Sequence, residues 1–275
     1  MRANEIERLA DDLLPVALAA GRVEMVHFSA GGVAVETKAD QSPVTVADVQ
    51  AEAVILEGLR RLMPGVPVIA EEEVAAGRIP DISGAFFLVD PLDGTKGFIK
   101  GRREFTINVG LVVERRPVFG LVYAPALSDL YVTTGPGTAL NVSIAPASEA
   151  RGLADLSPTP LRTRVPDPHA LVAFTSQSHL NRATESFLAR YQIVERRSLS
   201  SSLKFGLIAK GEADLYPRVA PTSEWDTAAG HAVLAAAGGA VTTLDGAPLL
   251  YGNAERQFVT PEFVAWGRGP LAPTR

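Results

Sequence analysis

The segment from residue 89 to residue 95 has the residue types and spacing of a binding site for a hard metal ion. It reads Val-Asp-Pro-Leu-Asp-Gly-Thr, so Asp90 and Asp93 lie three residues apart after an apolar run that predicts a strand. Such a turn can direct both carboxylates and a main-chain carbonyl at one point, and these are ligands that Mg²⁺ prefers. Asp-Pro and Asp-Gly are also common turn dipeptides, so this segment alone leaves a plain turn open.

Two more acidic residues lie where predicted elements end or begin. Glu71 follows a predicted strand, and Asp226 opens a predicted helix. An aspartate at a helix start commonly caps the helix, and this is the alternative for Asp226. Because α/β folds build their sites where strand ends and helix starts meet, we expect both residues to converge with the two aspartates of the 89–95 turn.

The composition excludes several classes of function. The chain has 275 residues and a net charge of −5, with no run of like charge, which argues against a nucleic-acid or membrane-surface partner. It has no cysteine, which removes disulfides and thiol chemistry, and its four histidines have no zinc-like spacing. No uncharged apolar run reaches the ~18 residues of a membrane span, and no signal-peptide pattern is present, so we expect a cytoplasmic protein.

The N-terminal half predicts two helices and an antiparallel sheet. Apolar residues recur at helical spacing from Glu5 to Phe28, where Pro15 is expected to bend the helix, and again from Val46 to Met63. Strand signals at 104–113, 118–123 and 130–133, joined by short turns, predict a meander, and therefore antiparallel pairing. The expected strands are 33–37, 66–70, 85–89, 104–113, 118–123 and 130–133.

The C-terminal half predicts alternating strands and helices, which is typical of an α/β unit. The stretch 135–167 is rich in Pro, Ser, Ala and Gly, and we place a subdomain boundary near its start, which gives two expected subdomains, 1–137 and 138–275. The expected strands are 171–174, 192–194, 213–216 and 240–243, and the expected helices are 180–191, 202–209 and 225–237.

Three motifs together resemble those of the inositol monophosphatase superfamily of metal-dependent, lithium-sensitive phosphatases. They are Glu71-Glu72, the 89–95 segment and Trp225-Asp226-Thr227-Ala228, in matching order and spacing. The resemblance implies a layered α+β and α/β sandwich, the sugar-phosphatase fold, with an N-terminal antiparallel-sheet half and a C-terminal α/β half. Further similarity to 3′(2′),5′-bisphosphate nucleotidases of the CysQ type lies in Lys96 and in segments 104–108, 201–205 and 215–218.

The resemblance implies a set of metal ligands. Glu71, Asp90 and the Leu92 carbonyl would hold one Mg²⁺, and Asp90, Asp93 and Asp226 would hold a second, with a third ion left open. Because these acidic side chains would repel a phosphate, we expect the metal to bind before the substrate or together with it.

The resemblance also implies catalytic and substrate-binding residues. Thr95 and Asp48 would orient and deprotonate the attacking water, with help from Glu72. In the family the loop of Lys38 closes on the site, although a solvated loop lysine is the alternative here. The residues expected to contact substrate are Leu92, Asp93, Gly94, Thr95, Ser201, Ser202, Lys204, Arg218 and Asp226.

The expected activity is hydrolysis of adenosine 3′,5′-bisphosphate to AMP and phosphate, with Lys204 and Arg218 pairing with the second phosphate. The alternative for both cations is a solvated surface position. Gly97 and Ala220 depart from the nucleotidase pattern near the presumed mouth. Two other functions stay open: an inositol or sugar monophosphatase with the same metals, and a non-catalytic nucleotide- or metal-sensing module. A homodimer is also left open.

Overall fold

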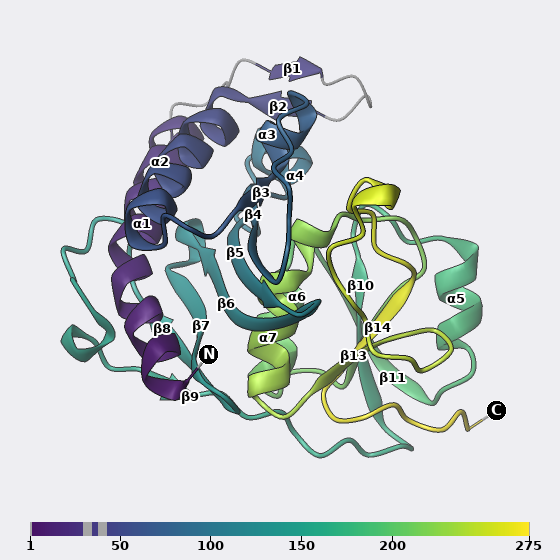
Figure 1. Ribbon diagram of the computed structural model, residues 1–275. Helices are drawn as coiled ribbons and strands as arrows, with labels where there is room; N and C mark the ends of the chain where they lie inside the picture. Colours follow the sequence, from purple (N-terminus) through teal and green to yellow (C-terminus); the bar gives the residue numbers. More distant parts are fainter. Residues whose placement is uncertain (1, 30–34, 38–42, 275) are drawn as a thin grey trace.

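Helices and sheets alternate in layers in the computed structural model, which describes residues 2–29, 35–37 and 43–274 (Figure 1). Two helices cover the outer face of a first sheet, two more fill the space between the sheets, and another covers the far face of the second sheet. The outer helices are α1 (Ala3–Ser29) and α2 (Val46–Leu62). The helices between the sheets are α6 (Leu203–Ala209) and α7 (Ala228–Ala236), and the helix on the far face is α5 (Arg182–Leu188).

The first sheet has seven strands in the order β3-β4-β5-β6-β7-β8-β9. Its strands pair antiparallel except for β3 and β4, which are parallel, so the predicted meander is confirmed. The strands are β3 (Val68–Ala70), β4 (Ala85–Asp93), β5 (Thr106–Val113), β6 (Arg116–Ala124), β7 (Asp129–Gly135), β8 (Thr138–Ser143) and β9 (Thr159–Pro160).

The second sheet has five strands in the order β11-β10-β12-β14-β13. Strand β10 is parallel to β11 and β12, as expected where helices connect strands, whereas β14 is antiparallel to both of its neighbours. The strands are β10 (Leu171–Ser176), β11 (Ile193–Leu199), β12 (Leu215–Arg218), β13 (Ala240–Thr243) and β14 (Phe263–Trp266).

Several short elements differ from the prediction. Residues 43–45 form β2 (Pro43–Thr45), which pairs with β1 (Val35–Thr37), and β2, β8, β9 and β14 were not predicted. Val33 and Lys38 lie outside the described residues. Helix α1 continues through Pro15. The subdomain boundary after residue 137 stays a prediction, and β8 and β9 join the first sheet beyond it.

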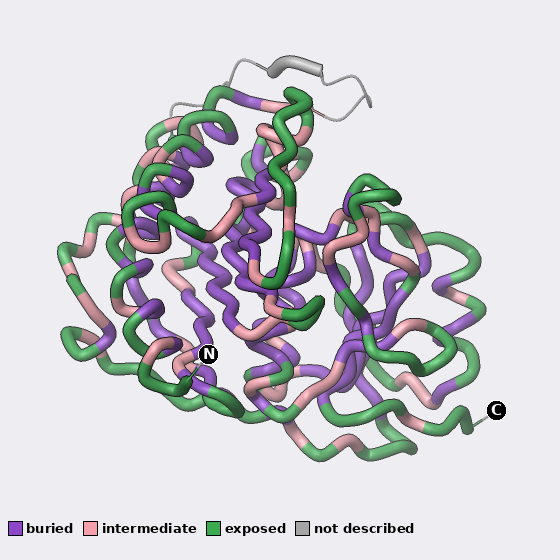
Figure 2. The backbone as a smooth tube through the Cα atoms, in the orientation of Figure 1, coloured by how far each residue is buried: buried purple, intermediate pink, exposed green. Residues whose placement is uncertain are grey.

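Close packing of α7 fixes the layer between the sheets. A Cβ atom at Gly110 would lie 2.9 Å from the Ala229 nitrogen, and one at Gly120 would overlap the Ala229 carbonyl. Only glycine therefore allows this small-residue helix to lie directly on β5 and β6, where buried residues concentrate (Figure 2). Within the described part of the chain, no helix is long and apolar enough to cross a bilayer.

Candidate active site

The end of β4 forms a turn that brings the two aspartates of the 89–95 motif together. The strand pairing shifts register between Asp90 and Asp93, and the Leu92 amide donates to Asp90 Oδ1 at 2.9 Å. Gly94 has a φ of 101°, a left-handed conformation that glycine adopts without strain. The chain then enters a short helix, α4 (Thr95–Ile99), which was not predicted.

Helix α2 carries Asp48 to this turn. Thr45 is the N-cap, and the Thr45 backbone and hydroxyl donate to Asp48 Oδ2 at 2.8 and 2.6 Å. The other carboxylate oxygen, Asp48 Oδ1, accepts from Thr95 Oγ1 at 3.1 Å. The predicted pairing of Asp48 and Thr95 is therefore present in the structure.

Glu71 and Asp226 reach the turn from two separate short helical segments. Glu71 begins α3 (Glu71–Ala75), directly after β3. Asp226 lies in a 3₁₀ turn, η3 (Glu224–Asp226), and the expectation that it opens the following helix is wrong, because α7 begins at Ala228. Asp226 Oδ2 instead accepts from the Ser223 amide at 3.1 Å and from the Thr222 hydroxyl.

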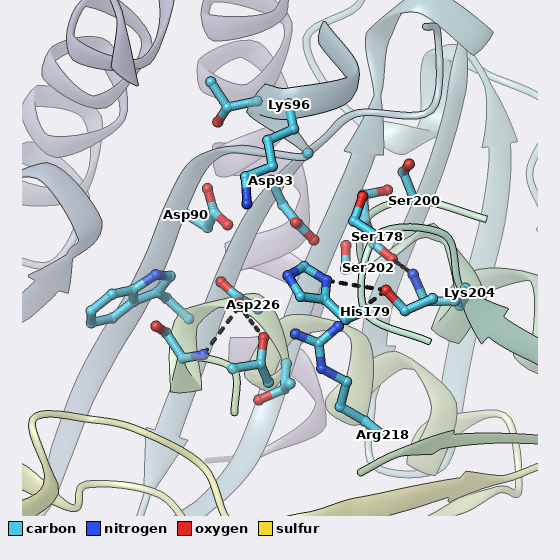
Figure 3. A pocket seen from close by; sticks show the side chains of 18 of the residues that line it. Asp90, Asp93, Lys96, Ser178, His179, Ser200, Ser202, Lys204, Arg218 and Asp226 are labelled. Atoms are coloured by element: carbon cyan, nitrogen blue, oxygen red, sulfur yellow. Dashed lines mark hydrogen bonds between the residues drawn. The ribbon is translucent and has the colours of Figure 1, made fainter. Parts of the chain in front are cut away.

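These segments create a concentrated acidic cluster. Glu71, Asp90 and Asp226 each offer a carboxylate oxygen, and the three oxygens all lie within 4.8 Å of one another. Asp93 lies outside this group of three but faces the same pocket (Figure 3). The donors are all hard oxygens, which fits a site for Mg²⁺ or a similar divalent ion.

Burial and mutual repulsion make this cluster costly without a cation. Burial first, and then the charges of Glu71 and Asp93, raise the pKa of Asp90 well above its ordinary value. Burial and the Asp226 charge raise the pKa of Asp93 to about 7. Because a bound divalent ion would favour the ionised carboxylates, the electrostatics agree with the chemistry of the donors.

Lys204 and Arg218 bring two positive charges to the wall of the same pocket (Figure 3). Their side chains are buried, at 3% and 7% exposure, so the surface-cation alternative is wrong. Lys204 Nζ donates to the carbonyls of Leu199, at 3.2 Å, and Ser201.

Arg218 braces the loop that leads to Asp226. Its Nη2 donates to the Pro221 carbonyl at 2.9 Å, and its Nη1 donates to Ser176 Oγ at 3.1 Å. Its Nε donates to the carbonyl of Ala220, one of the departures from the nucleotidase pattern, at 3.3 Å.

His179 was not predicted as a site residue. It follows β10 and lines the same pocket, with its Nδ1 3.3 Å from Ser176 Oγ. Partial burial and three nearby cations lower the pKa of His179 to about 4, and the cations are Arg218, Lys96 and Lys204. The sequence signal that could have indicated His179 is its place in a loop at the carboxyl end of a predicted strand, where α/β folds commonly build their sites.

The pocket has a volume of about 320 Å³ and gathers most of the predicted residues. Asp48 and Glu72 do not line it, and Asp48 reaches it through Thr95. The buried Ser202 hydroxyl donates to Asn108 Oδ1 at 2.5 Å and lies 2.9 Å from Thr106 Oγ1, so it is committed to the wall. The predicted lining residues are Glu71, Asp90, Leu92, Asp93, Gly94, Thr95, Ser201, Ser202, Lys204, Arg218 and Asp226.

The fold and the acidic cluster fit a protein that binds a divalent ion, and comparison with known proteins identifies the family. Residues 7–264 match the model of the inositol monophosphatase family. The chain is also 41% identical, over 83% of its length and 87% of the relative's, to the 3′(2′),5′-bisphosphate nucleotidase CysQ of Escherichia coli K12. The chain therefore belongs to the inositol monophosphatase family.

Solved structures confirm the expected sugar-phosphatase fold. The crystal structure of CysQ from Bacteroides thetaiotaomicron matches with a TM-score of 0.78 and 32% identity, over 97% of this chain and 98% of that one. A Thermotoga maritima inositol monophosphatase matches with a TM-score of 0.71 and 24% identity, over 92% and 89% of the two chains, a likeness of fold alone.

Proposed function

We propose that this protein is a Mg²⁺-dependent 3′(2′),5′-bisphosphate nucleotidase that converts adenosine 3′,5′-bisphosphate to AMP and phosphate. The observation that carries the proposal is a single pocket with opposite charges on its two sides. One side holds Glu71, Asp90 and Asp226, and the other holds the buried cations Lys204 and Arg218. The similarity to curated CysQ nucleotidases supports the same activity.

The acidic side would hold the magnesium ions. In the proposed arrangement Glu71, Asp90 and the Leu92 carbonyl serve one ion, and Asp90, Asp93 and Asp226 serve a second; a third ion stays open. When bound, magnesium neutralises charge on the reacting phosphate and makes the attacking water more acidic. The carboxylates that would hold the ions would thereby set where the reacting phosphate binds.

Thr95 and Asp48 would accept the proton that the attacking water loses. The Thr95 hydroxyl lies 3.1 Å from Asp48 Oδ1, so a proton accepted at Thr95 can pass to the carboxylate. Asp48 is held by Thr45, which prevents its side chain from turning away. Glu72 follows Glu71 on α3 and is proposed to assist.

The basic side would hold the phosphate that is not cleaved. Lys204 and Arg218 use several of their donors on carbonyls, but their positive charges face the pocket. An anion there would be stabilised by both charges and by His179, whose protonation the anion would favour. A monoester with one phosphate uses only the acidic side, so the second site gives selectivity for bisphosphates.

The functional test compares two substrates in the same assay. With Mg²⁺ present, we expect phosphate release from adenosine 3′,5′-bisphosphate at a kcat/KM well above that for inositol 1-phosphate, and no release in excess EDTA. Preference for the inositol ester would favour the monophosphatase alternative, and release from neither ester would favour a sensing module. A cytoplasmic location belongs to the proposal, and the oligomeric state stays open.

A further inference from the structure

Helix α2 contacts both acid-bearing segments of the site through two side chains one helical turn apart. Asp48 reaches Thr95 in the turn after β4, and Glu52 reaches the start of α3. Both side chains are buried, at 2% and 3% exposure. Residues four apart lie on one face of a helix, so this face holds the turn after β4 and α3 at a fixed spacing.

Glu52 supplies the cap that α3 lacks. The N-cap of α3 is Ala70, whose side chain has no oxygen to accept from the free amides of the first turn. Glu52 Oε2 instead accepts from the Glu72 amide at 2.8 Å. An acceptor from a separate helix thereby pairs with an amide in the first turn of α3.

The location of Glu52 is electrostatically unfavourable, which makes a purely packing role a poor explanation. Burial, opposed by backbone hydrogen bonds and reinforced by the charges of Glu72 and Glu73, raises the pKa of Glu52 to about 7. An apolar side chain would fill this space without that cost. What an apolar side chain would not provide is the hydrogen bond to α3.

We propose that Glu52 is a positioning residue for the metal site, an inference that rests on the proposed magnesium-dependent function. Glu71 is the first residue of α3, and its carboxylate oxygen lies within 4.8 Å of those of Asp90 and Asp226. The bond from Glu72 to Glu52 fixes the peptide that follows Glu71. Glu52 therefore holds Glu71 toward the other two acids before any cation binds, and it never contacts the cation itself.

The test measures Mg²⁺ affinity directly in four proteins: wild type, Glu52→Leu, Glu52→Gln and Glu57→Leu. Glu57 is exposed on the same helix and provides a matched control. The readout is the rise in melting temperature as MgCl₂ is titrated without substrate, at matched ionic strength. Partners that orient metal ligands typically contribute 10–100-fold to metal affinity, so Glu52→Leu should need about tenfold or more Mg²⁺ for the same rise.

The conservative variant Glu52→Gln distinguishes the effect of the hydrogen bond to α3 from the effect of the negative charge. Glu52→Gln keeps an oxygen that can accept from the Glu72 amide, so its titration should lie within about threefold of wild type, as should that of Glu57→Leu. At saturating Mg²⁺, Glu52→Leu should regain most of its kcat, with an unchanged KM for the bisphosphate. A Glu52→Leu titration that coincides with wild type overturns the inference.

A measurement on the wild type covers the case in which Glu52→Leu does not fold. Native-state hydrogen exchange should show the Glu72 amide protected in metal-free protein, and fast exchange there overturns the inference. If wild-type protein neither gains melting temperature with Mg²⁺ nor releases phosphate, the proposed function fails instead. The two failures are therefore distinguishable.

Discussion

Thr95 Oγ1 lies 3.1 Å from Asp48 Oδ1, although the two residues are 47 positions apart in the chain. The same hydroxyl is 3.1 Å from the Leu92 carbonyl, which is a proposed metal ligand. One small side chain thus connects the helix that carries Asp48 to the turn that carries the aspartates. In the proposed function this connection would link proton transfer to metal binding, and the first prediction tests it.

Thr95→Val should lower kcat for the bisphosphate about 100-fold or more, because it removes the hydroxyl with little change in volume and general acid–base assistance contributes about 10²–10⁴-fold. Thr95→Ser should retain most of the activity. Steady-state kinetics at saturating Mg²⁺ check both variants. A Thr95→Val enzyme within tenfold of wild type would mean that this hydroxyl only stabilises the turn.

Asp93→Asn should abolish most phosphate release while leaving the fold intact. The change keeps the side-chain volume and removes one negative charge from the proposed second metal site. Circular dichroism and a phosphate-release assay measure the two effects. A loss of less than about tenfold in kcat, equivalent to ~1.4 kcal/mol, would show that Asp93 is only a turn residue.

Lys204→Met and Arg218→Gln should each reduce kcat/KM for the bisphosphate far more than for a single-phosphate ester. A charge-assisted hydrogen bond to phosphate contributes ~1.5–3 kcal/mol, which predicts a ten- to hundredfold fall for the bisphosphate alone. Because both side chains also hold loop carbonyls, the single-phosphate ester is the internal control. Equal losses for both esters would assign these residues to loop support or to the reacting phosphate.

Glu24→Gln should stabilise the protein at neutral and alkaline pH. Glu24 is fully buried on α1, and neither carboxylate oxygen has a hydrogen-bond partner among the described residues. Burial and the Asp48 charge raise the pKa of Glu24 well above 4.5, so the folded state keeps a proton that the unfolded state releases. The wild type therefore loses stability as pH rises above about 4.5, toward the folded-state pKa, and glutamine removes this loss.

Thermal unfolding at several pH values measures the difference between Glu24→Gln and wild type. Each ~1 kcal/mol gained should raise the melting temperature by about 2–4 °C, with the gain largest at high pH and absent below pH 4.5. Glu7→Gln, an exposed change on the same helix, should show no such trend. A constant difference at every pH would contradict the account of Glu24.

The acidic side of the pocket could be predicted from sequence because its chemistry is concentrated in short motifs. Asp90 and Asp93 share one turn, and long periodic elements such as α2 place Asp48 correctly. Elements of five residues or fewer carry too little periodicity to be recognised, so α3, α4 and η3 were missed. The start of α7 was therefore placed too early.

The basic side was harder to predict because its residues come from separate elements: Lys204 from α6, Arg218 from the end of β12 and His179 from the loop after β10. Lys204 and Arg218 were named through family resemblance, but nothing local showed that they are buried. His179 belongs to no motif, and only the folding of β10 beside β12 brings it next to Arg218. Contacts that depend on sheet order are not encoded in spacing along the chain.

The most direct measurement of the proposed function is the identity of the product formed from adenosine 3′,5′-bisphosphate. If the protein is the proposed nucleotidase, which cleaves the 3′-phosphate, ³¹P NMR of the reaction should show inorganic phosphate and AMP, with the 5′-phosphate intact. Product that has instead lost its 5′-phosphate, or an absence of hydrolysis with Mg²⁺ present, would contradict the account.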